Sequence, residues 1–197
     1  MDIQKVSVPE GQSGDWRIER FTVSEEDASR TVWACMKPGM GRRSVPAGEY
    51  TRLKRGGTVV MSDTPGEAFD MRHFLWRARG QVLLNGVGLG WALQEAARKN
   101  EVEHVTGIDA SEDILNLIRD HYESMFGDKI TLTHADAMTW KPPKGVRYGA
   151  VYHDIWDYIC ADNLPEMHTL HRRYGRRCDW QGSWARDLCE MANKGQI

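Results

Sequence analysis

The chain has 197 residues, of which 41% are hydrophobic and 27% are charged, and its formal net charge is −2. The length suffices for one α/β domain with a modest extension, and the composition is that of an ordinary globular protein. The composition excludes a disordered chain and the net charge excludes a general polyanion binder, so nucleic acid is not an expected partner. No apolar run approaches the roughly 20 residues of a membrane span and no signal peptide opens the chain, so we expect no membrane association.

Residues 1–80 are predicted to form a small mixed α+β extension. A strand is only weakly indicated over residues 16–23, because the alternation of polar and apolar residues breaks within it. A helix should follow the N-cap Ser24, with Asp27 completing a capping pattern. Its apolar face is predicted to consist of Ala28, Val32 and Cys35. Pro38-Gly39 is predicted to end the helix.

A hairpin and a second helix are predicted to complete the extension. Residues 50–55 and 58–62 should pair around a Gly-Gly turn, since glycine tolerates the positive φ of tight turns. The helix start at residues 64–67 combines a threonine cap, a proline at the first helical position and a glutamate able to reach back to the cap. This helix should end before Gly80.

From residue 81 onward, short apolar strands alternate with amphipathic helices. We expect strands over residues 81–85, 104–109, 130–134 and 148–153, and helices over residues 89–100, 112–125, 163–174 and 180–193. This alternation predicts an α/β fold: a Rossmann-like, mostly parallel sheet with flanking helices and right-handed crossovers. Because no fifth strand is evident, the sheet of this second domain, residues 81–197, is expected to be shortened at its C-terminus.

A glycine loop, Asn85-Gly86-Val87-Gly88-Leu89-Gly90, lies between a predicted strand and a predicted helix. Glycine suits such a loop because the turn needs unusual dihedrals and because a ligand can approach a backbone without Cβ atoms. Asp109 ends the next strand, at a spacing that suits hydrogen bonds to ribose hydroxyls. Asp109 could instead cap the following helix, and Asp136, just past the third strand, could be a turn residue.

The segments VLLNGVGLGWAL, HVTGIDAS, ITLTHADAMTW and YGAVYHDIW together resemble the first four strands of class I S-adenosylmethionine-dependent methyltransferases, especially their spermidine-synthase-like branch. The resemblance implies binding of S-adenosylmethionine or its decarboxylated form. It places the methionine part at the loop, the ribose at the end of the second strand and the adenine after the third strand. The residues that inherit these roles are Asn85, Gly86, Gly88, Gly90, Asp109, Ala110, Asp136 and Ala137.

Asn85 departs from the family pattern, which has an acid before the first glycine. An amide does not ionise, so it should hold a cationic ligand less strongly. Three functions remain open: a methyltransferase acting on an unidentified small-molecule acceptor, a spermidine-synthase-like aminopropyl transferase, and a non-catalytic nucleoside-binding regulatory or structural protein. Apolar helices at both ends of the chain are also compatible with a homodimer.

Candidate catalytic residues follow the fourth strand, because ligands of open α/β sheets lie beyond the carboxyl ends of the strands. Asp154 could orient or deprotonate an acceptor, with Asp157 and Tyr158 beside it. Trp156 could stack on a substrate or meet a sulfonium through a cation–π contact. The alternative is that both aspartates cap the following turn and that the tryptophan belongs to the core.

The C-terminal segment carries histidines, arginines and tryptophans whose ordinary role is structural. His168 and His171 lie three residues apart near Cys178, but without a second paired ligand motif we predict no metal site. The four cysteines form no CxxC pair, which suits free thiols and a cytoplasmic location. Trp180 and Trp184 fall on one face of the helix predicted over residues 180–193.

Overall fold

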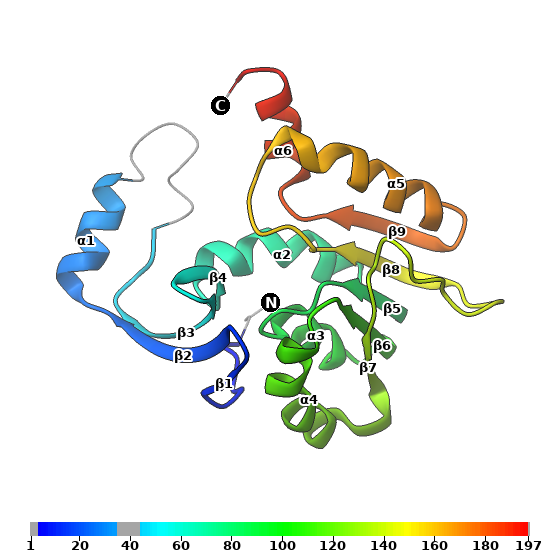
Figure 1. Ribbon diagram of the computed structural model, residues 1–197, viewed down its shortest axis with the longest axis horizontal. Helices are drawn as coiled ribbons and strands as arrows, with labels where there is room; N and C mark the ends of the chain where they lie inside the picture. The colour runs from blue at the N-terminus through cyan, green and yellow to red at the C-terminus, as the bar shows by residue number, and fades with distance from the viewer. Residues whose placement is uncertain (1–3, 35–43, 197) are drawn as a thin grey trace.

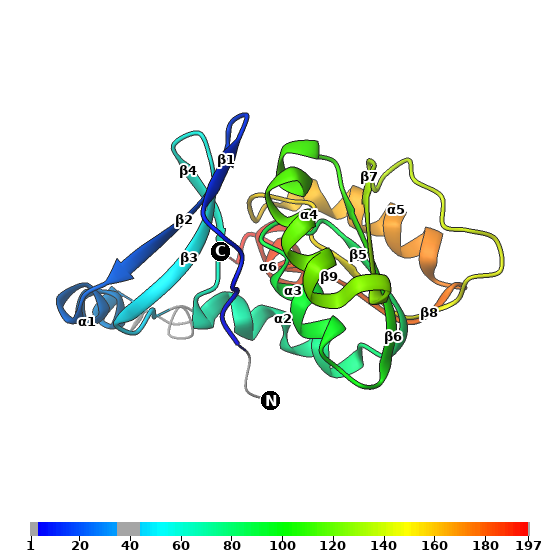
Figure 2. The same ribbon diagram turned by 90° about the horizontal axis from the view of Figure 1, so that it is seen from below.

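The computed structural model describes residues 4–34 and 44–196. It contains a four-stranded antiparallel sheet beside a five-stranded sheet that is flanked by helices (Figures 1 and 2). The α/β, Rossmann-like architecture with a small mixed N-terminal part is therefore confirmed. None of the described helices has the length and apolar character needed to cross a bilayer.

The N-terminal sheet is an antiparallel meander with strand order β1-β2-β3-β4. Its strands are β1 (Gly11–Ser13), β2 (Trp16–Val23), β3 (Gly48–Arg55) and β4 (Thr58–Ser62). The weakly indicated strand is thus present over its full predicted length, because pairing with β1 and β3 on both sides compensates for its broken alternation. The predicted hairpin connects β3 to β4, and Gly56 has the positive φ of +56° that its turn requires.

Helix α1 (Glu25–Ala34) begins as predicted, because the Asp27 amide donates to Ser24 Oγ at 3.1 Å. The predicted positions of Cys35 and the Pro38-Gly39 stop lie outside the described residues. Helix α2 (Pro65–Arg77) also begins at its proline, but the expected reciprocal cap is wrong. The side chain of Thr64 makes no capping bond, and Glu67 accepts instead from the backbone N and Oγ of Ser62, at 2.7 and 2.8 Å.

All the strand pairs of the larger sheet are parallel, in the order β7-β6-β5-β8-β9. Its strands are β5 (Gly80–Asn85), β6 (Val102–Asp109), β7 (Ile130–His134), β8 (Tyr148–His153) and β9 (Cys178–Ser183). The helices that follow α2 along the chain are α3 (Trp91–Ala97), α4 (Glu112–Phe126), α5 (Leu164–Tyr174) and α6 (Arg186–Asn193).

Strand β9 corrects the expectation of a missing fifth strand. The helix predicted over residues 180–193 begins only at Arg186, and residues 178–183 pair with β8. Residues that are four positions apart lie on the same face of a helix and also on the same face of a strand. The spacing of Trp180 and Trp184 therefore does not distinguish a helix from a strand. In the fold, Trp180 packs against His73 and Phe74 of α2, with ring centroids 5.3 and 6.4 Å apart.

The start of α3 and the burial of Met125 also differ from prediction. Helix α3 begins at Trp91 rather than Leu89, because Gly90 adopts a left-handed conformation with φ of 78°. Met125, expected to point inward from α4, is 39% exposed, whereas Ile118 and Tyr122 of the same helix are fully buried.

The larger sheet is covered on both faces. Val82 and Leu84 of β5 point into a core shared with α2, α3 and α4, whereas Leu83 between them packs with Leu170 of α5 on the opposite face. This alternation follows from the two-residue repeat of a strand. Residues of the N-terminal sheet, such as Leu53, also belong to the first core, so the two sheets share one apolar interior.

Gly90 provides a stability test of the loop. A Cβ at this position would lie 2.2 Å from the Tyr122 ring, and φ is +78°. At Gly145 φ is a similar +82°, but no atom lies within 4 Å of such a Cβ. We expect Gly145→Ala to destabilise by about 1 kcal/mol through backbone strain alone. Gly90→Ala should destabilise by a further ~1–3 kcal/mol through overpacking, as measured by urea unfolding; equal losses would contradict this packing.

Candidate functional site

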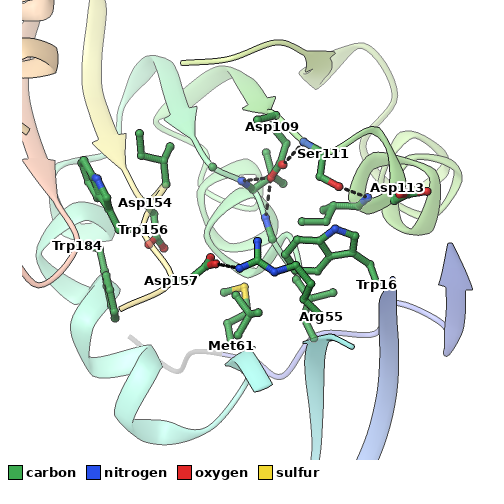
Figure 3. Close-up of a pocket in the computed structure, with 18 of the residues that line it drawn as sticks. Trp16, Arg55, Met61, Asp109, Ser111, Asp113, Asp154, Trp156, Asp157 and Trp184 are labelled. Carbon is green, nitrogen blue, oxygen red and sulfur yellow. Dashed lines mark hydrogen bonds and ion pairs between the residues drawn. The ribbon is translucent and has the colours of Figure 1, made fainter. Parts of the chain in front are cut away.

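A cavity of about 940 Å³, called here the site cavity, lies between the two sheets at the carboxyl ends of β5, β6 and β8 (Figure 3). This is the edge at which open parallel sheets bind their ligands. Of the predicted site residues, those that line it are Gly86, Gly88, Asp109, Ala110, Asp154, Asp157 and Tyr158. Asn85, Gly90, Asp136 and Ala137 are not among its lining residues.

The glycine loop is shaped by packing within the protein. Gly86 and Gly88 have φ values of +88° and +52°. A Cβ on Gly86 would lie 1.9 Å from the Asp154 carbonyl oxygen, and one on Gly88 would lie 2.2 Å from Met61 Sδ. The Met61 sulfur also accepts a hydrogen bond from the Leu89 amide at 3.1 Å. The loop therefore needs glycine because side chains at these positions would collide with the protein itself. The sequence alone suggests another reason, the approach of a ligand.

Asp109 binds the glycine loop from the end of β6. Its Oδ2 accepts from the amides of Val87 and Gly88 at 3.0 and 3.3 Å, and its Oδ1 accepts from Ser111 N at 2.9 Å. The cap of α4 is Ser111, whose Oγ accepts from Ile114 N at 3.3 Å. Asp109 is thus not a simple helix cap: its carboxylate connects the loop after β5 to the start of α4.

Asp136 and Ala137 serve the turn after β7. Asp136 Oδ1 accepts from Met138 N at 2.7 Å, the pattern of an Asx turn. Arg173 of α5 donates to the carbonyl oxygens of Ala137 and Trp140 at 2.7 and 3.3 Å. This arginine of the basic C-terminal segment therefore anchors the turn.

Asn85 lies behind the glycine loop in a buried polar pair. Its Nδ2 donates to His153 Nδ1 at 2.7 Å, and both residues are fully buried at the ends of the adjacent strands β5 and β8. Burial lowers the pKa of His153 to about 3, so the ring is neutral. Its Nε2 faces the acceptor Gln181 Oε1 at 3.4 Å and so carries the ring proton, which leaves Nδ1 as an acceptor. The amide of Asn85 can donate to this accepting nitrogen, whereas an ionised carboxylate has no proton to donate. The hydrogen bond to His153 thus accounts for an asparagine at the position where the family pattern has an acid.

Asp154 follows β8 and faces the site cavity (Figure 3). Burial raises its pKa to about 7, and the nearby carboxylates of Glu67, Asp70 and Asp109 act in the same direction. Burial likewise raises the pKa of Glu67 to about 7. Carboxyls in such surroundings can take up or release a proton near neutral pH, which is the property required of a general base or acid.

The rim of the cavity holds the other two candidates. Asp157 forms an ion pair with Arg55 of β3. Tyr158 is 67% exposed, and Trp156 donates from its indole to Glu166 at 2.8 Å.

The N-terminal part contributes site residues that sequence reasoning missed. The lining includes Trp16, Leu53, Arg55, Val60, Met61, Glu67 and Asp70. No local pattern marks most of them, since they reach the cavity only through the docking of one sheet on the other. Glu67 did carry a signal, but its spacing from Thr64 also fits a capping glutamate.

One histidine of the C-terminal segment, His171, forms polar contacts with its neighbours. His171 contacts Ser183 Oγ through Nε2 at 2.9 Å and Arg186 through Nδ1 at 3.0 Å. Within residues 4–34 and 44–196, no group of three or more His, Cys, Asp or Glu side chains is arranged to hold a metal ion.

Comparison with known proteins gives one family and several solved structures of similar fold. Residues 82–175, just under half of the chain, match the family described as "Methyltransferase domain". No curated protein matches. The spermidine synthase of Thermotoga maritima aligns with 84% of this chain and 52% of its own length, at 15% identity and a TM-score of 0.47. The CcbJ methyltransferase of Streptomyces caelestis aligns over 57% and 43%, at 20% identity and a TM-score of 0.42.

A third structure, the YcgJ protein of Bacillus subtilis, aligns with 54% of this chain and 44% of its own length, at 14% identity and a TM-score of 0.42. The chain thus spans about half the length of these three structures. Structural similarity of this extent does not assign an activity. The finding that is relevant to the site is the family match. It covers the glycine loop, Asp109 and Asp154. The resemblance of residues 82–175 to the methyltransferase superfamily, first seen in the glycine loop and the acids that follow it, is therefore confirmed.

Proposed function

We propose that the chain is an S-adenosylmethionine-dependent methyltransferase that acts on a small-molecule acceptor. One observation carries this proposal: a single cavity joins the glycine loop, Asp109 and Asp154 at the carboxyl ends of three neighbouring strands. Its volume of about 940 Å³ lies in the range of small-molecule sites. A cytoplasmic location and the absence of a nucleic-acid partner remain part of the proposal.

The lining chemistry fits a cationic cofactor. When bound, S-adenosylmethionine supplies an electrophilic methyl group on a positively charged sulfur. Among the described residues that line the cavity there is one lysine or arginine, Arg55, and it pairs with Asp157. The acids in the lining are Glu67, Asp70, Asp109, Glu112, Asp113, Asp154 and Asp157. Their negative field favours a sulfonium over a neutral ligand.

Asp109 suits the ribose contact that the resemblance implies. Its Oδ1 accepts a hydrogen bond from Ser111 N, and a carboxylate oxygen has room for a second. A ligand that approaches Gly88 must displace Met61, whose long unbranched side chain adapts readily.

Asp154 is suited to the acceptor side of the cavity. With its pKa near 7, its carboxyl can hold a proton-bearing nucleophile or remove the proton that the nucleophile loses. An aminopropyl transferase is the second candidate, because the acid-rich lining also suits a polyamine and decarboxylated S-adenosylmethionine.

Calorimetric titration with S-adenosylmethionine, S-adenosylhomocysteine, decarboxylated S-adenosylmethionine and NAD tests the cofactor. We expect the first two to bind and NAD not to bind. A clear preference for the decarboxylated form would favour the second candidate. Binding of NAD alone, or of none of the four, would refute the proposal.

Asp109→Ala should weaken the affinity for S-adenosylhomocysteine by about 1–3 kcal/mol, because it removes both the ribose acceptor and the bonds that hold the loop. Glu112→Ala is the matched control, since Glu112 lines the same cavity but is exposed. Calorimetry measures both variants, and circular dichroism verifies that they are folded. Unchanged affinity in a folded Asp109→Ala protein would exclude Asp109 from the cofactor site.

Asp154→Asn tests the raised pKa. The folded pKa of about 7 exceeds the unfolded value of 3.8, so the stability from the protonated carboxyl is complete below about pH 4 and is lost as pH rises through 7. The wild type should therefore lose more free energy of unfolding between pH 5 and pH 8 than the variant. Asp128→Asn, on an exposed turn, should behave as the wild type.

The same variant separates catalysis from binding. Asp154→Asn should keep its affinity for S-adenosylhomocysteine while its turnover falls. Equal losses of affinity and turnover would indicate a structural role for Asp154.

A further inference from the structure

The N-terminal sheet forms the second wall of the site cavity. Trp16 of β2, Arg55 of β3 and Met61 of β4 lie opposite the glycine loop and the loop after β8 (Figure 3). Trp16 and Arg55 are direct cross-strand partners. A ligand that fills the cavity therefore meets side chains of the N-terminal sheet as well as residues of the larger domain.

Trp16 is held in place by its neighbours. The Arg55 guanidinium lies 5.2 Å from the centre of the Trp16 ring, within the range of a cation–π contact. Arg55 also pairs with Asp157, so this contact connects the indole to the loop after β8.

The turn before Trp16 is attached to α4. Ser13 Oγ donates to Asp113 Oδ1 at 2.6 Å. A Cβ on Gly14 would lie 2.5 Å from Asp113 Oδ2, so the turn and the first turn of α4 are in close contact. Trp16, three residues after Ser13, consequently lies beside the start of α4, close to Ser111 and Asp113 (Figure 3).

The position of Trp16 corresponds to the base end of the proposed nucleoside cofactor. A nucleoside whose ribose meets Asp109 extends its base either toward α4 or toward β8. The β8 side holds the acids Asp154 and Asp157. The α4 side also holds two acids, but Glu112 is exposed and Asp113 accepts from Ser13, and beside them lies the apolar surface of Ala110 and Ile114, which suits the flat face of a base. The base contacts implied by the family, Asp136 and Ala137, are not among the residues that line the cavity. The aromatic lining residue on the α4 side is Trp16; the others, Trp156, Tyr158 and Trp184, belong to the β8 and β9 side.

We propose that Trp16 of the N-terminal sheet is the stacking contact for the adenine base of the cofactor. The inference rests on the proposed function and adds a binding residue from outside the region that matches the family. An indole offers a large flat surface, and stacking on a base contributes about as much as a good hydrogen bond. The N-terminal sheet is then part of the cofactor site and not only a cover for it.

The test uses calorimetric titration of the full chain with S-adenosylhomocysteine. We expect Trp16→Leu, which keeps an apolar side chain but removes the aromatic surface, to weaken binding about tenfold or more. Trp16→Phe keeps an aromatic ring and should recover most of the affinity. Trp76→Leu is the matched control: Trp76 is 69% exposed on α2 and does not line the cavity, so its affinity should equal that of the wild type.

Tryptophan fluorescence gives a second readout that does not depend on affinity. S-Adenosylhomocysteine at saturation should quench the wild type and the Trp76→Leu protein equally, and the quenching should be clearly smaller in Trp16→Phe, where only Trp156 and Trp184 of the described lining tryptophans still respond. This holds even if Trp16→Leu fails to fold.

The outcomes separate this inference from the proposed function. If the wild type binds and Trp16→Leu binds equally well, or if Trp16→Phe retains full quenching, Trp16 is not the base contact and the proposed function stands. If the wild type binds none of the nucleosides of the calorimetric series, the proposed function fails and this inference fails with it.

Discussion

The carboxylate of Asp109 is the interaction on which the site depends. It binds the amides of Val87 and Gly88 through one oxygen and that of Ser111 through the other. Hydrogen bonds to an ionised acceptor are stronger than those between neutral groups. One side chain at the end of β6 therefore fixes the position of the loop after β5 relative to the start of α4. These two segments form the floor of the cavity.

The rest of the site is built around this floor by packing. Gly86 allows the backbone of Asp154 to approach, and Gly90 allows the ring of Tyr122 to approach, whose hydroxyl donates to Leu89 O at 2.7 Å. Asn85 and His153 join the two strands beneath the loops through a neutral hydrogen bond. The charged groups lie instead around the cavity, where burial, together with the nearby carboxylates, raises the pKa of Asp154.

Much of the fold could be predicted from periodicity, and the failures have identifiable causes. Helix α4 was predicted to within one residue, because its apolar positions recur at helical spacing and Ser111 caps it. Strand β9 was missed because the four-residue spacing of Trp180 and Trp184 suits either element, and only pairing with β8 selects the strand. The capping role predicted for Glu67 is wrong because its half-buried carboxyl bonds to Ser62, the last residue of β4.

By itself, the sequence determined the α/β class, the position of the glycine loop between a strand and a helix, and the acid that ends the next strand. These features depend on local dihedral preferences and on short-range periodicity, which neighbouring residues encode. Only the tertiary structure decided that Met61, Arg55 and Trp16 face the loop, that Asp136 lies away from the cavity lining, and that the pKa of Asp154 is near 7. Those properties arise from contacts and burial between segments far apart in the chain, which no local pattern specifies.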